Sequence, residues 1–417
     1  MFVEGRPEPI LALIAFVVAA ALAWLLVPAA EGIARRIGAI DHPNERSLHT
    51  LPTPKLSGLA ILLAVVVAGA LFLPWVALTH ALLAGAIVIA LVGVVDDLWD
   101  LPAAAKLLGQ AAAAAIPVFN GVQVASFSVP FLGRLDLASV DLLSPPLVGN
   151  VQLGHMLTIV GIVAVINMIN LIDGVDGLAA GVCVISATAL AVVALSLSRT
   201  SAGVLAALTA GGALGFLRHG FPPASSFMGD TGSNLLGYLL GAIAVQGALK
   251  ANAVVALFFP LVILAVPILD TGFVVAKRIK YRRPIHRADR WHFHHRMANV
   301  GFSQRRTLAY LYGWTLVMAG LALALRFVPY SDDQGNFDSF WIAVMVGCLL
   351  VTVVASFYLV VTLEIVKLRR TRARELTVAR GARPATAEVD EEVARELETG
   401  SFAAIDPPPE EGPAGEP

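Results

Sequence analysis

Long apolar segments recur along the whole chain, and they constrain its fold more than any other feature of the sequence. A membrane-spanning helix needs about 20 mostly apolar residues, and about eleven segments meet this requirement. Only 14% of the 417 residues are charged, whereas soluble domains carry about 25%. The sequence therefore predicts an all-α polytopic membrane protein. The expected spans lie near residues 9–30, 57–78, 80–95, 103–118, 152–172, 178–197, 201–217, 232–248, 252–275, 307–326 and 338–366.

The distribution of basic residues predicts how these spans are oriented. Eleven spans place the two termini on opposite sides, and basic residues favour the cytoplasmic side of a membrane. With the N-terminus outside, the cytoplasmic segments are 31–56, 96–106, 218–231, 276–306 and the tail from 367. All but five of the 29 Lys and Arg residues then lie on the cytoplasmic side. The exceptions are Arg6, Arg134, Arg199, Lys250 and Arg326.

Composition divides the chain into a membrane domain and a tail. Residues 1–366 contain all the expected spans. Residues 367–383 are basic, and residues 384–417 are acidic and rich in proline, which is typical of disorder. Residues 119–150, on the expected outer side, alternate apolar and polar residues between Gly and Pro and predict a small external β-hairpin. The formal net charge of -1 does not indicate a nucleic-acid partner.

The carboxylates near the expected spans form a pattern of their own. A carboxylate deep in a bilayer costs about 2.5–3.5 kcal/mol, and these residues gather where spans end or begin on the cytoplasmic side. We therefore expect them to share one site, although each Asp taken alone is equally well explained as a helix-end residue or N-cap. They are Asp96, Asp97 and Asp100 after the third span, Asp173 and Asp176 after the fifth, and Asp230 before the eighth.

Such a cluster favours a hard divalent cation that carries a phosphate, and Mg²⁺ is the expected ion, with Mn²⁺ as an alternative. Asn170 lies three residues before Asp173, a spacing that predicts one helix face and adds a neutral oxygen ligand. Asp270 lies inside the ninth span and suits a different class of protein, an ion-coupled transporter with an intramembrane relay.

Basic residues and histidines on the same side predict an anion-binding partner for the acidic cluster. The loop 276–306 contains the sequence HFHHR, and imidazoles beside Arg can bind a diphosphate. A lipid-anchoring loop and a zinc site are the alternatives. The first cytoplasmic loop, 31–56, also carries cationic side chains, and Lys106 lies one turn into the fourth span. Lys106 either extends towards the lipid headgroups or holds a phosphate.

Six motifs in this order resemble the polyprenyl-phosphate N-acetylhexosamine-1-phosphate transferases (glycosyltransferase family 4). The resemblance spans about residues 41–306 and is greatest to the undecaprenyl- or decaprenyl-phosphate N-acetylglucosamine-1-phosphate transferases. The motifs are DHPNERSLH…PTPKLSG, VVDDLWD, KLLGQ, NMINLIDGVDGLAAG, FMGDTGSN and RPIHRADRWHFHHR. The resemblance implies a catalytic domain over 1–366 in the cell (inner or plasma) membrane, with its active site on the cytoplasmic face.

The resemblance also implies roles for individual residues. Asp230 and Asn170 resemble Mg²⁺ ligands. The implied catalytic group comprises Asp96 and Asp97, which activate or place the lipid phosphate, the phosphate-binding Lys106, Asp173, and the loop residues His292, His294, His295 and Arg296 on the diphosphate and sugar side. The implied substrate-binding group comprises Asp176, the uracil-stacking Phe227, Arg46, His49, Lys55 and Arg290.

The implied reaction transfers N-acetylglucosamine-1-phosphate from UDP-N-acetylglucosamine to polyprenyl phosphate and releases UMP, as the first membrane step of cell-envelope polymer synthesis. A phospho-N-acetylmuramoyl-pentapeptide transferase is the alternative within the family, and a homodimer is left open. The chain departs from the family where Ser47 follows the arginine of the first loop and where Ser57 precedes Gly58. Both departures concern the first loop and leave the acidic motifs intact.

Overall fold

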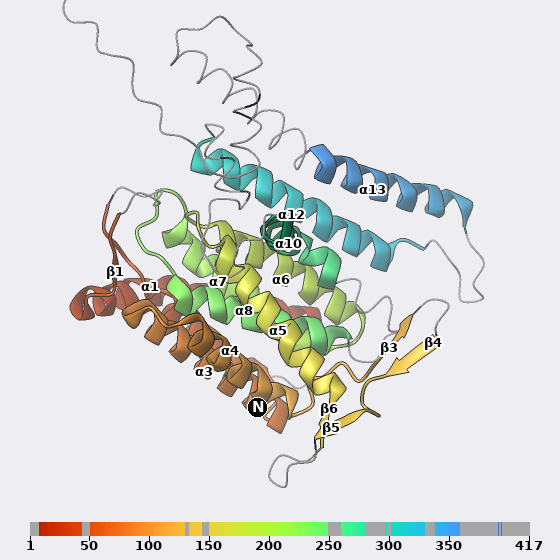
Figure 1. Ribbon diagram of the computed structural model, residues 1–417, viewed down its shortest axis with the longest axis horizontal. Helices are drawn as coiled ribbons and strands as arrows, with labels where there is room; N and C mark the ends of the chain where they lie inside the picture. Colours follow the sequence, from red (N-terminus) through yellow and green to blue (C-terminus); the bar gives the residue numbers. More distant parts are fainter. Residues whose placement is uncertain are drawn as a thin grey trace, which may run out of the picture. The chain divides into compact units, whose positions relative to one another are not determined.

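The computed structural model describes most of the membrane domain (Figure 1). The described residues are 8–43, 51–129, 133–143, 150–248, 260–280, 302–329 and 338–358, with the single positions 293, 297, 391 and 393. The chain divides into two compact units. The larger unit comprises Met1–Thr271 and Leu308–Leu349, and the smaller comprises Gly272–Thr307 and Leu350–Pro417.

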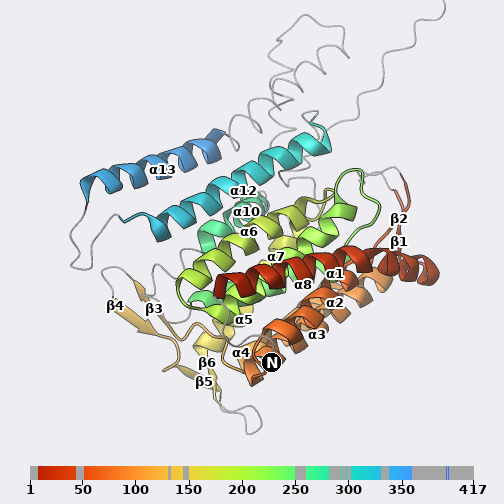
Figure 2. The same ribbon diagram turned by 180° about the vertical axis from the view of Figure 1, so that it is seen from behind.

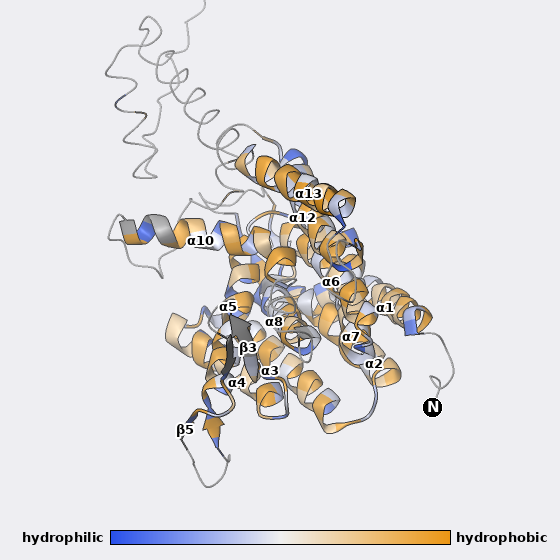
Figure 3. Cartoon of the chain, turned by 90° about the vertical axis from the view of Figure 1, so that its right-hand side faces the viewer, coloured by the Kyte–Doolittle hydropathy of each residue, from blue (hydrophilic) through white to orange (hydrophobic). Residues whose placement is uncertain are grey.

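The described residues are mostly helical, which confirms the expected class of fold. Each predicted span overlaps a helix, and seven helices (α1, α3, α5, α6, α7, α12 and α13) are long and apolar enough to cross a membrane. Figure 3 shows the apolar colouring that covers the helices of the larger unit. The helices are α1 (Glu8–Ile37), α2 (Gly58–Phe72), α3 (Ala77–Trp99), α4 (Ala103–Val118), α5 (Leu153–Ile172), α6 (Leu178–Ser196), α7 (Thr200–Gly220), α8 (Gly229–Ala248), α10 (Ala265–Lys280), α12 (Gln304–Phe327) and α13 (Ser339–Phe357).

Several expected span ends are wrong: α1 continues to Ile37 rather than ending near residue 30, and α10 continues to Lys280 rather than ending near 275. Two further ends are wrong because of local backbone chemistry. Helix α2 ends at Phe72 rather than near residue 78, since Leu73 is extended (ψ 151°) before Pro74, where a helical conformation is disfavoured. Helix α3 continues past residue 95 to Trp99, and Asp100 ends it in the left-handed region (φ 47°). The expected loop 96–106 therefore shrinks to 100–102, and Asp96 and Asp97 belong to the last helical turn.

Helix α8 forms the centre of the larger unit. It packs against α2, α3, α5, α6 and α7 and is buried without interruption from Thr231 to Ile243. A Cβ on Gly58 would lie 2.2 Å from the Gly232 nitrogen, and a Cβ on Gly93 would lie 2.4 Å from the Thr231 Cα. The backbones of α2 and α3 therefore approach the first turn of α8 with no side-chain layer between them.

Three short antiparallel strand pairs occupy the ends of the larger unit (Figures 1 and 2). Strands β1 (Ile40–Asp41) and β2 (Thr53–Pro54) pair at one end. At the opposite end, β3 (Ser126–Val129) pairs with β4 (Gly133–Asp136) within the segment 119–150 that was expected to form a hairpin. Strand β5 (Asp141–Leu143) of the same segment pairs with β6 (Val151–Gln152), which directly follows that segment. The number of helices that cross the membrane and the side that each end faces stay predictions.

In the smaller unit, the described side chains are few. The rings of Phe273 and Phe293 lie 5.7 Å apart in a tilted arrangement, and Phe293 and Met297 are buried.

Candidate active site

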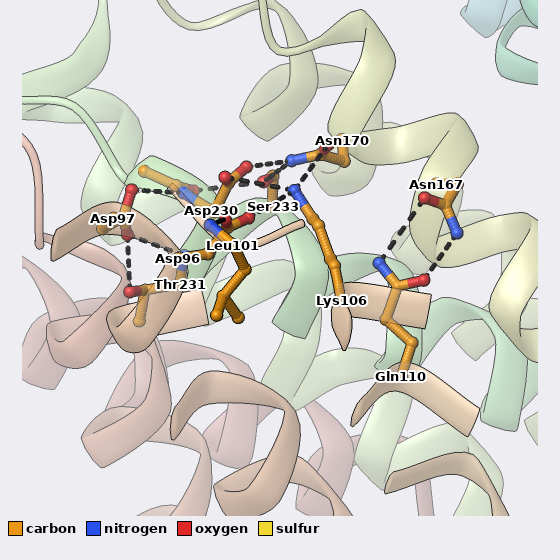
Figure 4. Close-up of polar contacts among 11 residues, drawn as sticks. Asp96, Asp97, Leu101, Lys106, Gln110, Asn167, Asn170, Asp230, Thr231 and Ser233 are labelled. Carbon is orange, nitrogen blue, oxygen red and sulfur yellow. Dashed lines mark hydrogen bonds and ion pairs between the residues drawn. The ribbon is translucent and has the colours of Figure 1, made fainter. Parts of the chain in front are cut away.

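Lys106 is the centre of a polar cluster contributed by four helices (Figure 4). Its Nζ lies 2.7 Å from Asp96 Oδ2 on α3 and 3.1 Å from Asp230 Oδ2 on α8, and it donates to Asn170 Oδ1 on α5 at 3.4 Å. Asp96 also accepts a hydrogen bond from the Leu101 backbone nitrogen at 2.8 Å. Lys106 therefore turns into the protein rather than towards the lipid headgroups, and the expected meeting of distant motifs is confirmed for these four residues.

The side chain of Asn170 is fixed by two acceptors on α8. Its Nδ2 donates to Asp230 Oδ1 and, at 2.9 Å, to Ser233 Oγ. The amide oxygen consequently faces Lys106, so the amide presents an acceptor to the cation. Ser233 was not among the expected site residues, although Ser233 follows Asp230 by three residues and the two side chains therefore share a face of α8.

Asp97 binds the beginning of α8 from the neighbouring helix α3. Its carboxylate accepts hydrogen bonds from the Asp230 nitrogen at 2.9 Å, the Thr231 nitrogen at 3.0 Å and Thr231 Oγ1 at 2.7 Å. The preceding Gly229 has a φ of 66°, and a Cβ there would lie 2.5 Å from the same carboxylate. Free backbone N–H groups at a helix N-terminus attract a negative charge, so Asp97 stabilises the turn that carries Asp230.

A pair of side-chain amides lies next to this cluster, between α4 and α5. Asn167 Nδ2 donates to Gln110 Oε1 at 2.7 Å, and Gln110 Nε2 donates to Asn167 Oδ1 at 3.5 Å. Gln110 is fully buried. Paired polar side chains hold apolar helices together because an unpaired amide there is costly. Gln110 follows Lys106 by four residues and Asn167 precedes Asn170 by three, a spacing that could have revealed both.

The first loop is paired with the segment before α8. Backbone hydrogen bonds run from the Phe227 nitrogen to the Pro54 oxygen (2.9 Å), from the Ser57 nitrogen to the Phe227 oxygen (3.1 Å) and from the Gly58 nitrogen to the Met228 oxygen (3.0 Å). The buried hydroxyls of Ser57 and Ser226 lie 2.5 Å apart. We call these two residues the buried serine pair. The departure from the family at Ser57 thus adds a contact that fixes the segment carrying Phe227.

A cavity of about 330 Å³ opens beside the cluster. Five of the expected site residues line it, together with the expected ion ligands Asn170 and Asp230. Asp41, which had no expected role, also lines the cavity. These five are Lys55, Asp97, Asp173, Asp176 and Phe227.

Acidic residues of the loop 173–177 form one wall of this cavity. Burial, followed by the charges of Asp230, Asp97 and Asp176, raises the pKa of Asp173 well above its ordinary value. Asp176 Oδ2 accepts a hydrogen bond from the Ala224 nitrogen at 3.1 Å. Helix α5 ends at Ile172, so Asp173 is the residue that caps this helix, and both Asp173 and Asn170 line the cavity.

Seven of the expected site residues lie outside the described part of the chain. They are Arg46 and His49 in the first loop, and Arg290, His292, His294, His295 and Arg296 in the loop 276–306. Their roles stay predictions.

The cluster has the chemistry of a cation site. Within the described ranges, no group of three or more His, Cys, Asp or Glu side chains is arranged to hold a metal ion. Oxygens of Asp96, Asp230 and Asn170 nevertheless converge on one positive charge, the ammonium of Lys106. Carboxylate and amide oxygens suit Mg²⁺, so Asp230 and Asn170 fit the expected ion in ligand type.

Fold and site together define a multi-pass membrane protein with an acidic cluster that faces a cavity at one end of its helices. Residues 79–248 match the family model described as glycosyl transferase family 4. The chain is 37% identical over 318 residues to the probable undecaprenyl-phosphate N-acetylglucosaminyl 1-phosphate transferase of Bacillus subtilis. The aligned residues make up 75% of this chain and 84% of the relative.

Two further relatives are similar over most of the chain. The decaprenyl-phosphate N-acetylglucosaminephosphotransferase of Mycobacterium tuberculosis is 33% identical over 84% of this chain and 89% of its own length. The phospho-N-acetylmuramoyl-pentapeptide-transferase of Moorella thermoacetica is 31% identical over 74% of this chain and 96% of its own length. The chain belongs to glycosyl transferase family 4, which confirms the resemblance stated from the motifs.

Proposed function

We propose that this protein transfers N-acetylglucosamine-1-phosphate from UDP-N-acetylglucosamine to polyprenyl phosphate and releases UMP. The observation that carries the proposal is the Lys106 cluster beside a cavity lined by the motifs of the family. The two relatives named as N-acetylglucosamine transferases, at 37% and 33% identity, favour this donor. The muramoyl-pentapeptide relative is less similar, at 31%. All three relatives are named as transferases, which favours this reading over the transporter alternative based on Asp270.

The arrangement suits a phosphoryl-type transfer, which depends on positioning and charge neutralisation. A phosphate oxygen of the lipid forms a bond to the sugar-bearing β-phosphorus. The bond from that phosphorus to the oxygen shared with the α-phosphate breaks, and UMP leaves. We propose direct attack, without a covalent enzyme intermediate. Lys106 would bind phosphate oxygens through its ammonium, and Asp96 or Asp97 would accept the proton of a protonated lipid phosphate.

Asp230 and Asn170 are the residues that would hold Mg²⁺, with Mn²⁺ as an alternative. When bound, the ion would supply positive charge against the diphosphate. The chain's own part is to fix these two ligands: Ser233 holds the amide of Asn170, and Asp97 holds the turn of α8 on which Asp230 lies.

The nucleotide is proposed to occupy the cavity. Phe227 offers a flat face for the uracil, and the loop 173–177 with Asp176 contributes further lining residues. We further propose that the protein lies in the cell membrane with this end towards the cytoplasm. The basic residues support that orientation, and the strand pairs of the expected outer segment lie at the other end of the helices (Figure 1).

A reconstitution tests the proposal. Purified protein is incubated with UDP-N-acetylglucosamine, polyprenyl phosphate and Mg²⁺, each omitted in turn, and UMP release is measured. We expect release to require all three and to fall at least about 100-fold in Asp230→Asn. Asp141→Asn, an exposed change at the opposite end of the helices, is the matched control and keeps wild-type activity.

A donor panel with UDP-N-acetylmuramoyl-pentapeptide separates the two family branches. Faster UMP release from that donor would overturn the assignment of N-acetylglucosamine. If neither donor gives UMP release, the proposed reaction is overturned.

A further inference from the structure

Tyr312 on α12 reaches the loop that forms one wall of the cavity. Its hydroxyl donates a hydrogen bond to the Gly177 backbone oxygen at 2.6 Å. Gly177 lines the cavity and directly follows Asp176. Tyr312 lies outside residues 79–248, the part of the chain that the family model matches. It touches the loop only from behind and does not line the cavity itself.

Helix α6 has a vacant position that accommodates the ring of this tyrosine. A Cβ on Gly181 would lie 2.1 Å from Tyr312 Cζ and 2.2 Å from its hydroxyl oxygen. Gly181 lies one helical turn after Gly177, and its nitrogen donates to the Gly177 oxygen at 2.9 Å. The ring is therefore seated against α6 and aimed at the same carbonyl oxygen that begins the helix. Any larger residue at position 181 would displace it.

The loop 173–177 depends on contacts of this kind because its backbone is unusual. Gly177 has a φ of 75°, which an L side chain rarely adopts, and a Cβ there would lie 3.2 Å from the Gly220 oxygen. Asp176 on the other side of the bend holds the Ala224 nitrogen at 3.1 Å. The loop is thus held between the segment after α7 on one side and Tyr312 on the other, and the position of Asp173 and Asp176 follows from both.

We propose that Tyr312 is a positioning residue for the nucleotide side of the site, acting through Gly177 on the loop that carries Asp173 and Asp176. This inference rests on the proposed function for the identity of the ligand. A hydrogen bond that fixes a binding loop contributes about 0.5–1.5 kcal/mol, and its loss weakens the contacts of that loop with the ligand. Loss of the hydroxyl should therefore weaken donor binding more than it weakens the folded helices.

Three variants of the full-length protein test the inference. Tyr312→Phe keeps the ring and removes the hydroxyl, and Gly181→Ala displaces the ring. Thr315→Val is the matched control, because it also removes a buried hydroxyl from α12 but one that bonds within the helix, to the Leu311 oxygen at 2.8 Å. The readouts are KM for UDP-N-acetylglucosamine, kcat at saturating donor, the dissociation constant of UMP, and the thermal midpoint.

We expect Tyr312→Phe and Gly181→Ala to raise KM and the UMP dissociation constant by about threefold to tenfold. The value of kcat should change less than twofold in Tyr312→Phe, and Thr315→Val should match the wild type in KM. A wild-type KM in Tyr312→Phe would overturn the inference. So would a rise in KM that Thr315→Val reproduces together with an equal loss of thermal midpoint, since that result marks a structural role only.

Failure of the proposed function looks different. A wild-type protein that binds UMP but releases none from UDP-N-acetylglucosamine would refute the reaction, while the UMP dissociation constants of the variants still decide the role of Tyr312. A wild-type protein that does not bind UMP would overturn both.

Discussion

Substituting Asp97 with Asn separates a positioning role of this carboxylate from a role in proton transfer. The wild-type carboxylate accepts three hydrogen bonds, one from the Asp230 nitrogen and two from Thr231. An Asn side chain has one acceptor oxygen, so its NH₂ group must face a backbone N–H donor. An unsatisfied buried donor costs about 1–3 kcal/mol, and loss of the charge at the helix N-terminus costs about 0.3–2 kcal/mol.

Taken together, these effects weaken the first turn of α8 by about 1–5 kcal/mol. We expect a lower thermal midpoint in detergent and a loss of UMP release of about 100-fold or more. Thr231→Val is the comparison variant, because it removes the 2.7 Å hydroxyl contact and keeps the carboxylate. It should cost about 1.5–3 kcal/mol, the range for a hydrogen bond to a charged group.

The ratio of activity loss to stability loss in the two variants is the decisive quantity. If Asp97 only positions α8, the loss of activity is proportional to the loss of stability in both variants. If it also accepts a proton, Asp97→Asn loses at least about tenfold more activity than its stability predicts. An Asp97→Asn protein with wild-type thermal midpoint and wild-type turnover would refute both the capping contact and the proton-transfer role.

Three further predictions concern neighbouring contacts. Lys106→Met leaves Asp96 without its cation and should reduce kcat by about 100-fold or more, and a variant with over a tenth of wild-type turnover would contradict the cluster's role. Gln110→Leu leaves Asn167 Oδ1 without its donor, whereas Asn167 Nδ2 keeps its bond to the Val163 oxygen, and the change should cost about 1 kcal/mol; the thermal midpoint should rise again when Asn167→Leu is added, and a double variant less stable than the single one would argue against the pairing. Ser57→Gly breaks the buried serine pair and should lower the thermal midpoint by a few degrees with turnover kept within about threefold, whereas loss of all activity would show that the loop depends on this hydroxyl.

The sequence sufficed to predict the helical membrane fold and the meeting of most of the acidic residues. Asp100, which was expected in the same site, is instead the exposed residue that ends α3 and does not line the cavity. Apolar length and charge placement are one-dimensional signals, so the spans and the convergence of Asp96, Asn170 and Asp230 followed directly from them. The orientation of side chains was harder to foresee. Nothing in the spacing showed that Asp97 faces the N-terminus of α8, because that contact depends on the left-handed Gly229. The contact of Tyr312 depends on helix packing across a long separation in sequence.

Helix ends were the other weakness of the sequence analysis. The break after α2 required attention to Pro74, and the extension of α3 followed from Asp100 adopting the left-handed region. Hydropathy averages over many residues, whereas a helix stops at one residue for a local reason.

The close approach at Gly58 and Gly93 bears on how enzymes of this kind could acquire new donors. Even a methyl group is too large at either position, so α2 and α3 fix the place of the first turn of α8, which carries Asp230, and leave it no room to move as the ligand changes. Evolution towards a bulkier or smaller sugar would then have to work on the surrounding loops at 51–57, 173–177 and 221–228. A laboratory selection for altered donors should enrich substitutions there and spare Gly58 and Gly93.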